Sequence, residues 1–252
     1  MTPKISIFII AYNSERKIEA CLKSVEWAEE IVVVDSFSRD ATAEICRKYG
    51  AKVHNREFKD YADQKNYALS LVHNPWALSL DTDEVVSEPL KEEILRALAS
   101  SSPVNAYRIP RQSFMFGRKF RFTGTQDDAP VRLLRTACAR FEQPIHEVVK
   151  VEGATAKLFN PIFHYTYASI DDYWGRFSRY TALEAEYLQS KNAPVSWVDF
   201  FVRPWAVFFK LYFLKQGFRD GFEGFLFSAF SAFYAFAKYA KYRERLKGTD
   251  AA

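Results

Sequence analysis

Apolar and polar positions alternate in blocks along the first hundred residues. Short apolar runs rich in β-branched residues are each followed by a more polar segment that reads as a helix. Runs of this kind predict buried strands, and strands that alternate with helices predict a parallel sheet covered on both faces. The four runs are Ile5–Ile10, Ile31–Val34, Ala51–His54 and Trp76–Leu80.

Capping residues indicate where the intervening helices begin. Ser14, Asp60 and Ser87 each stand in front of a predicted helix. Asp40 or Thr42 opens a further one, which a glycine ends. Short polar side chains at these positions accept hydrogen bonds from the first free backbone N–H groups of a helix. The predicted helices cover about residues 14–25, 40–49 and 60–71, and a fourth starts at 87.

The pattern is less regular between about residues 103 and 166. Asn105–Arg111 and Val131–Arg135 are predicted strands, and the loop Thr123–Pro130 between them is rich in Gly and Asp. This part of the chain therefore continues the sheet with a longer connection.

From Asp171 onward the chain reads as helical and strongly aromatic. We therefore expect an α/β domain over residues 1–168 and a helical C-terminal region over residues 169–252. The three predicted helices of that region cover residues 171–190, 197–216 and 221–247.

The composition is that of a globular protein, with 48% hydrophobic and 26% charged residues among 252. Three cysteines, Cys21, Cys46 and Cys138, have no short pair spacing, which favours free thiols in a reducing compartment. The first residues lack the pattern of a signal peptide, and no apolar stretch reaches the length of a membrane span. We therefore expect a cytoplasmic protein without a transmembrane helix.

Polar residues directly follow three of the predicted strands. These segments are Ala11–Glu15, Asp35–Asp40 and Asp81–Glu84. Ligands of open parallel sheets bind outside the carboxyl ends of the strands. The sequence therefore predicts that acids and amides from all three segments gather on one rim.

The acidic segment Asp81-Thr82-Asp83-Glu84 is the most informative of the three. Three acids in four residues repel one another unless a positive charge lies among them. Carboxylate oxygens suit Mg²⁺ or Mn²⁺, and both ions bridge carboxylates to diphosphates. The alternative is a solvated acidic turn that caps the next helix; the strand in front of it and the other two segments favour the metal.

The other rim residues have binding and structural interpretations. Asp35 is placed to accept from the imide N–H of uracil, or else caps a turn. Asn13 and Glu15 bind a base or cap the helix near Ser14. Lys65 is either a point charge for a diphosphate or a solvent-facing lysine.

No glycine-rich phosphate loop is present, neither G-x-G-x-x-G nor a Walker A motif. This counts against dinucleotide oxidoreductases and P-loop NTPases. A nucleotidyltransferase would need a triphosphate loop rich in Gly, Arg or Lys after the first strand, and Ala11–Glu15 does not supply one.

Taken together, the motifs resemble family 2 glycosyltransferases, which have the GT-A fold. The resemblance is strong over about residues 4–95 and fair over 125–150. Within the family, the sequence is similar to the lipopolysaccharide core branch of β-1,4-glucosyltransferase-like proteins. The matching segments are Ile9–Glu15, Ile31–Ser36, Asp40–Thr42, Tyr61–Ala68, Leu80–Glu84 and Tyr212–Gly224.

The resemblance implies a role for each rim residue. Asp83 would bind a divalent metal, Mg²⁺ or Mn²⁺, with Asp81 and His146 as further ligands. Ser36–Ser38 departs from the family, many members of which carry a second acid and a Gly there, so base contacts by Ser36 are not expected. The implied donor-binding residues are Ala11, Tyr12, Asn13, Glu15, Asp35, Gln64, Lys65, Asp81 and Thr82.

The resemblance also implies an inverting mechanism in which one carboxylate deprotonates the acceptor hydroxyl. Asp128 is the first candidate, because an Asp four positions before an Arg-Leu pair is typical of the branch. Asp127 and Glu147 are the alternatives. His146 stands in a His-Glu pair that the branch also has, and it serves the metal, the leaving diphosphate or only the local structure. His54, His73 and His164 are expected to be structural.

The C-terminal helices combine basic and aromatic residues. Residues 200–252 carry nine Lys or Arg and four Asp or Glu, interleaved with many aromatic rings. Such helices lie on anionic membrane surfaces with the apolar face down. A helical hairpin packed on the core, or a dimer interface, is the alternative. Nucleic acid is not an expected partner, because the rings are too dense and the basic residues too few.

Together with the residues above, the family 2 resemblance implies a metal-dependent transferase that moves a hexose from a nucleotide sugar, UDP-sugar favoured, to a lipid-anchored saccharide such as the lipopolysaccharide inner core. It would be peripheral on the inner face of the cytoplasmic membrane. A polyisoprenyl-phosphate sugar transferase is one alternative. A non-catalytic, membrane-associated adaptor on a GT-A-like fold is another, although such an adaptor would be expected to have lost Asp81 or Asp83.

Overall fold

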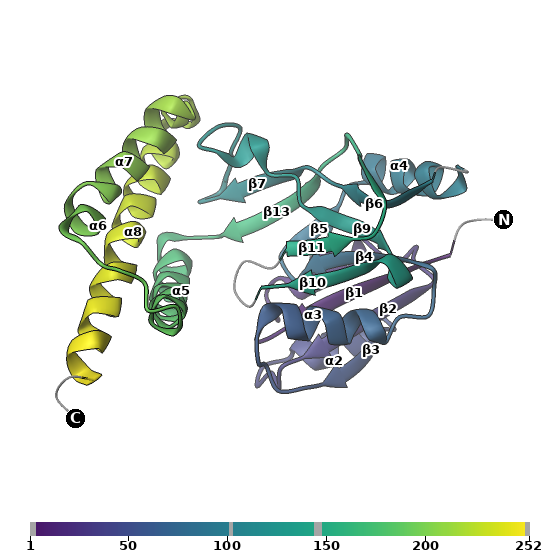
Figure 1. Ribbon diagram of the computed structural model, residues 1–252. Coiled ribbons are helices and arrows are strands. Elements are labelled where there is room, and N and C mark those ends of the chain that lie inside the picture. The colour runs from purple at the N-terminus through teal and green to yellow at the C-terminus, as the bar shows by residue number, and fades with distance from the viewer. Residues whose placement is uncertain (1–3, 101–102, 144–147, 250–252) are drawn as a thin grey trace. The chain divides into compact units, whose positions relative to one another are not determined.

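The chain forms two compact units, each built from two separate stretches of sequence. The structure is a computed structural model that describes residues 4–100, 103–143 and 148–249 (Figure 1). The first unit contains residues 1–111 and 128–164, and the second contains residues 112–127 and 165–252. The domain boundary expected after residue 168 stays a prediction.

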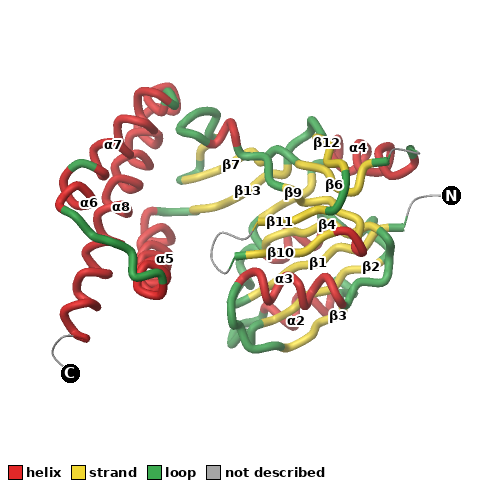
Figure 2. Tube along the Cα trace, viewed as in Figure 1, coloured by secondary structure: helices red, strands yellow, loops and turns green. Residues whose placement is uncertain are grey.

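A seven-stranded mixed sheet is the centre of the first unit (Figure 2). Strands β4, β1, β2 and β3 run parallel, as the sequence predicts, whereas β9 is antiparallel to both β4 and β6. The order across the sheet is β12 (Ala154–Lys157), β6 (Val104–Arg108), β9 (Val131–Arg135), β4 (Trp76–Asp81), β1 (Ile5–Ala11), β2 (Glu30–Asp35) and β3 (Lys52–Asn55).

Side chains of alternating strand positions build a core on each face of this sheet. Ile5, Ile7 and Ile9 of β1 join one buried cluster, while Phe8 joins the other. Successive strand residues point to opposite faces, so a strand that is apolar at nearly every position is buried on both. This is why Ile5–Ile10 is a continuous apolar run.

Four helices connect the strands of the first unit. The Asp60 side chain accepts from the Asp63 N–H, and the Ser87 side chain accepts from the Leu90 N–H, which confirms both predicted caps. The helix expected from Ser14 begins only at Ile18, after a turn in which the Ser14 carbonyl accepts from the Ile18 N–H. The helices are α1 (Ile18–Lys23), α2 (Thr42–Lys48), α3 (Tyr61–Ser70) and α4 (Glu88–Ala99).

Two short pairings complete the first unit. Strand β10 (Ala139–Glu142) pairs with β11 (Val148–Val151), and β5 (Glu84–Val86) pairs with the first half of β13 (Ile162–Tyr167). Both are antiparallel. The second pairing sets His164 opposite Glu84, so it brings a distant histidine to the acidic segment.

The second unit is mainly helical. Long helices α5 (Ile170–Ser190) and α8 (Gly221–Thr249) pack against each other through stacked rings, among them Tyr173 with Phe230 and Phe177 with Phe233, at centroid distances of 4.7 and 5.3 Å. The smaller elements of this unit are β7 (Arg111–Met115), β8 (Arg118–Lys119) and 3-10 turns at Thr125–Asp127 and Gly217–Asp220. A further 3-10 turn, Thr136–Cys138, belongs to the first unit.

The prediction of a single helix over residues 197–216 is wrong. The segment divides into α6 (Trp197–Phe201), α7 (Arg203–Phe209) and a π-helical turn, Lys210–Leu214. Pro204 explains the first break, because proline fits the first turn of a helix but has no N–H to continue a preceding one. No helix in the described part of the chain is long and apolar enough to cross a bilayer.

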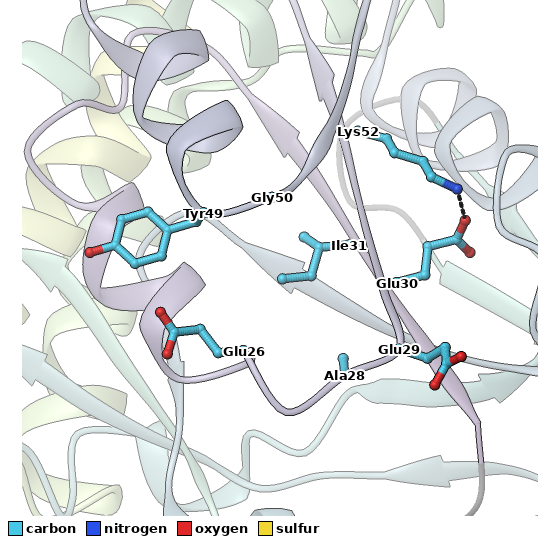
Figure 3. A pocket seen from close by; sticks show the side chains of 8 residues that line it. All are labelled: Glu26, Ala28, Glu29, Glu30, Ile31, Tyr49, Gly50 and Lys52. Atoms are coloured by element: carbon cyan, nitrogen blue, oxygen red, sulfur yellow. Dashed lines mark hydrogen bonds and ion pairs between the residues drawn. The ribbon is translucent and has the colours of Figure 1, made fainter.

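Glu30, the first residue of β2, forms a cluster of hydrogen bonds and an ion pair at the end of the strand opposite to Asp35. Glu30 accepts from Ser6 Oγ at 2.7 Å and from the His73 N–H at 2.9 Å, and it forms an ion pair with Lys52 at 2.8 Å. Figure 3 shows this pair at the edge of a shallow pocket of about 180 Å³. Burial alone would raise the pKa of Glu30, but these hydrogen bonds lower it to about 2.

Replacing Glu30 by Gln is expected to lower the free energy of unfolding at pH 7 by up to about 3 kcal/mol, because each unit of pKa shift is worth about 1.4 kcal/mol. A lowered pKa stabilises the fold above the ordinary value of 4.5, and this contribution disappears as the pH falls towards 2. Urea unfolding at pH 7 and pH 3 measures it. Glu29→Gln, which removes an exposed pair with Lys4, is the control; equal losses in both variants would contradict the assignment.

Candidate active site

The carboxyl ends of β1, β2 and β4 lie side by side, as the sequence predicts. Ala11 is in register with Asp35 on β2, and Ile10 is in register with Asp81 on β4. The acids Asp35 and Asp81 therefore flank the end of the same central strand. This register brings the three polar segments onto one rim.

Asp35 is buried, with only 2% of its surface exposed, and it organises the loop that follows it. Its carboxylate accepts from the Ser38 N–H at 2.8 Å and from Ser38 Oγ at 2.5 Å. Ser38 Oγ in turn accepts from the Asn13 N–H, and Asn13 Oδ1 accepts from the Arg39 N–H, both at 2.9 Å. Asn13 and Phe37 adopt positive φ angles of 45° and 58°. The loops after β1 and β2 are therefore bonded into one structure.

Further side chains after β1 and β4 contact the loops that follow β1 and β2. Ala11 is buried, while Tyr12 is 45% exposed at the rim. Glu15 accepts from the Ala41 N–H at 3.1 Å, so its carboxylate supports the loop before α2. Thr82 Oγ1 donates to Ser14 Oγ at 3.1 Å and so joins the acidic segment to the first loop. Binding of a base by these residues stays a prediction.

Gln64 lies fully buried beside the loop that follows β2. Its Nε2 donates to Ser36 Oγ at 3.0 Å and to the Arg56 carbonyl at 3.3 Å. Its Oε1 is buried without a hydrogen-bond partner among the described residues. A buried acceptor without a partner is costly, and a catalytic role, a water or an ion can account for such a group.

Lys65 and Arg132 hold the Asp81 carboxylate from two sides. Lys65 Nζ lies 3.0 Å from Asp81 Oδ1, and the Arg132 guanidinium lies 2.6 Å from Oδ2. Burial disfavours the charged carboxylate, but Arg132 and Lys65 outweigh it and hold the pKa of Asp81 well below its usual range. Lys65 is only 2% exposed, so its interpretation as a solvent-facing lysine is wrong. The sequence reasoning did not single out Arg132 for this role.

Glu84 links Asp81 to Asp128 through two arginines. Glu84 is fully buried and accepts from the Asp81 N–H at 3.0 Å. Its Oε1 lies 2.6 Å from the Arg132 guanidinium and 3.4 Å from that of Arg111. Arg111 binds Asp128 Oδ2 through both Nε and Nη2, each at 2.7 Å. A continuous ionic network therefore runs from the acidic segment to the first candidate base.

Asp83 points to a different set of partners from those of Asp81. Its carboxylate is 3.4 Å from His164 Nε2 and 3.7 Å from Lys17 Nζ, and the residue is 8% exposed. His164 comes from β13, some 80 positions later in the chain, so only the β5–β13 register reveals it. The sequence alone predicts a structural His164 and does not predict its contact with Asp83.

A carboxylate suits Mg²⁺ or Mn²⁺, and a neighbouring imidazole is a ligand that transition metals accept. The described residues include no group of three or more His, Cys, Asp or Glu side chains able to enclose a metal. Ions bound between protein and phosphates need only one or two carboxylates from the protein. Asp83 and His164 therefore fit a metal completed by a substrate, although Lys17 Nζ lies 3.7 Å from Asp83 Oδ2. The oxygens of Asp81 have closer cations, at 3.0 and 2.6 Å.

The remaining candidates lie apart from this network or outside the described residues. Asp127 belongs to the second unit, where its exposed carboxylate pairs with Lys215 at 2.6 Å. His146 and Glu147 lie outside the described residues. Among the described residues, Asp128 is thus the candidate base that the network connects to the acidic segment.

The motif at 212–224 also acquires a structural role within the second unit. Buried Asp220 accepts from the Arg121 N–H, the Phe122 N–H and Thr123 Oγ1, at 2.7–3.0 Å. Gly224 packs so tightly that a Cβ there would be 2.0 Å from the Gly217 carbonyl oxygen. The motif therefore fixes the chain just before Asp127.

Sequence comparison identifies the family. The sequence model of the family described as "Glycosyl transferase family 2" matches residues 6–151, which is more than half of the chain. The chain belongs to glycosyl transferase family 2. Strands β2 to β4, nearly all of β1 and the ionic network from Asp81 to Asp128 lie within the matched region, whereas His164 lies beyond it.

Relatives within family 2 are similar over most of their length. The lipopolysaccharide core biosynthesis glycosyltransferase LpsC of Rhizobium meliloti is 29% identical over 90% of this chain and 87% of its own. An uncharacterized glycosyltransferase of Rickettsia typhi is 31% identical over 89% of this chain and 82% of its own. The similarity covers more of the chain than the family match, so it extends into the C-terminal part.

A solved structure confirms the GT-A class of the fold. Glucosyl-3-phosphoglycerate synthase from Mycobacterium tuberculosis, in complex with Mn²⁺, uridine diphosphate and phosphoglyceric acid, superposes with a TM-score of 0.50. The likeness covers 77% of this chain and 80% of that chain at 18% sequence identity. The mostly parallel sheet of this chain therefore has a counterpart among GT-A enzymes.

Proposed function

We propose that this protein is an inverting hexosyltransferase that uses a nucleotide sugar, UDP-sugar favoured, and a lipid-anchored saccharide acceptor such as the lipopolysaccharide inner core. The observation that carries the proposal is the ionic network from Asp81 through Arg132, Glu84 and Arg111 to Asp128. It connects the rim that would hold a donor to a carboxylate able to serve as base.

Two comparisons support the choice of donor and acceptor. The mycobacterial GT-A structure contains uridine diphosphate with Mn²⁺, which favours a UDP-sugar here. The Rhizobium relative is named for lipopolysaccharide core biosynthesis, which favours an envelope saccharide as acceptor. An acceptor of that kind would place the enzyme on the inner face of the cytoplasmic membrane.

Asp83 and His164 would hold the divalent metal, and Asp81 would act mainly as the partner of two cations. When bound, a metal of this kind neutralises charge on a departing diphosphate. Lys65, buried and 3.0 Å from Asp81, supplies a fixed positive charge on the same rim. Fixed charges aimed at a developing negative charge need no reorganisation during the reaction.

Asp128 would take the proton of the acceptor hydroxyl. Its Oδ2 is bound by Arg111, which leaves Oδ1 for the acceptor. Arg111 positions the carboxylate through this one oxygen, and a base must lie within hydrogen-bond reach of the proton that it takes. The hydroxyl oxygen then forms the new bond at the anomeric carbon as the bond to the nucleoside diphosphate breaks, which inverts that carbon.

Isothermal titration calorimetry tests the donor site. UDP is expected to bind in Mn²⁺ and not in EDTA, and GDP and ADP are expected to bind more weakly. Asp83→Ala and His164→Ala should reduce binding in Mn²⁺ to the EDTA level, because each removes one proposed ligand. His146→Ala tests the earlier expectation for that residue in the same way.

Two outcomes would count against the proposal. Absence of nucleotide binding under every condition would remove the donor site and favour a non-catalytic adaptor. If His164→Ala binds UDP fully in Mn²⁺ and His146→Ala does not, His146 rather than His164 is the metal ligand. Lys4→Ala, an exposed site far along β1 from the rim, is the matched control.

A further inference from the structure

An outward-facing stripe of aromatic side chains runs along α6, α7 and the π-turn of the second unit. Its members recur every four residues, and between 48% and 72% of each is exposed. Aromatic side chains bury large apolar areas in most proteins, so five such rings in a row on a surface are unusual. The stripe consists of Trp197, Phe201, Trp205, Phe209 and Phe213.

A parallel inner stripe shows that these helices are packed normally on their other side. Phe200 contacts Phe236 of α8, and Phe208 and Tyr212 both contact Phe225 of α8, with ring centroids 5.8–6.1 Å apart. Phe201, Phe209 and Phe213 of the outer stripe each follow one of these inner rings by one step in sequence. The helices therefore use one face for α8, beside which they lie in Figure 1, and leave the aromatic face uncovered.

Charge around the stripe indicates what covers it. Residues 197–219 contain the bases Arg203, Lys210, Lys215 and Arg219 but a single acid, Asp199. Asp199 is buried and is bonded to Arg203 at 2.9 Å. The segment therefore presents basic and aromatic groups and no exposed acid of its own. The exposed acid Asp127 pairs with Lys215, which leaves Lys210 and Arg219 as exposed bases that form no ion pair with a described residue.

We infer that the aromatic stripe docks onto an anionic lipid surface. Trp and Phe favour the headgroup region of a bilayer, and nearby Lys and Arg are attracted to anionic headgroups. A second copy of the chain would instead bring two basic segments together, which like charges oppose. No described helix can span a bilayer, so the stripe would lie along the surface. The biological meaning rests on the proposed function, because a lipid-anchored acceptor lies at such a surface.

Vesicle co-sedimentation of the full chain, without nucleotide, tests the inference. The wild type is expected to sediment with phosphatidylglycerol-containing vesicles, less at high salt, and to remain in solution with pure phosphatidylcholine. The variant Trp197→Ser, Phe201→Ser, Trp205→Ser is expected to lose binding. Phe159→Ser, which removes an 84% exposed ring from the first unit, is the matched control and should bind like the wild type.

A second variant keeps the test valid if the triple variant fails to fold. Lys210→Glu leaves every ring in place and should weaken binding to anionic vesicles. The inference is overturned if the wild type ignores anionic vesicles, or if both stripe variants bind as the wild type does. It is also overturned if light scattering finds a wild-type dimer that the triple variant disrupts. UDP binding, measured by calorimetry without vesicles, tests the proposed function independently. A chain that binds UDP but not anionic vesicles would overturn only the membrane inference.

Discussion

Replacing Asp128 by Asn is expected to lower kcat by about 10²–10⁴-fold, the usual contribution of a general base. Asn keeps the size of the side chain and a contact with Arg111 but cannot take a proton from the acceptor. Because this exchange alters none of the residues proposed to bind the nucleotide, UDP affinity should change little. Steady-state transfer assays with calorimetry of the same variant measure both quantities.

Asp127→Asn is the matched control for this experiment. Asp127 is the neighbouring acid, but it is exposed and pairs with Lys215 of the second unit. We expect that variant to retain most of its kcat. A large loss in Asp127→Asn or in Glu147→Gln, with Asp128→Asn still active, would reassign the base.

Replacing Arg132 by Met is expected to lower the free energy of unfolding by about 3–5 kcal/mol, the usual cost of removing one partner from a buried ionic group. The Arg132 side chain is 6% exposed and touches both Asp81 and Glu84 at 2.6 Å. Without it, the two carboxylates share a buried site with less positive charge. Urea unfolding of the variant and wild type at pH 7 measures the loss.

The loss should shrink at low pH. Arg132 contributes to holding the pKa of Asp81 below its usual value, and a lowered pKa stabilises the fold above the ordinary value near 3.9. As the pH falls below 4, the carboxylate becomes protonated in the unfolded chain first and later in the folded protein, so the advantage of the wild type declines. Arg140→Met, at an exposed position, is the control. A constant difference from pH 7 to pH 3 would contradict this account.

Local sequence determined the frame of the molecule. Apolar runs such as Ile5–Ile10 specify strands buried on both faces, and Asp60 and Ser87 specify helix starts, because these preferences act within a few residues. The parallel order of such strands also determined that the polar segments after β1, β2 and β4 share a rim. Family membership follows from those same segments.

Tertiary structure decided which side chains on the rim meet. Lys65 and Arg132 reach Asp81 from a helix and a strand that are 16 and 51 positions away, and His164 reaches Asp83 only through the β5–β13 register. No local pattern contains such pairings, because they depend on strand order and direction. Whether Lys65 faces solvent or a carboxylate was likewise open until the sheet was assembled.

The same distinction holds for the C-terminal helices. Their aromatic and basic composition is visible in the sequence, as is the proline that interrupts the expected helix at Pro204. Which rings pack on α8 and which face outward depends on the π-turn at Lys210–Leu214 and on contacts with Phe225 and Phe236. Composition determined that the rings are present, and only packing decided which of them remain exposed for a partner, because burial is a property of the assembled helices rather than of any one segment.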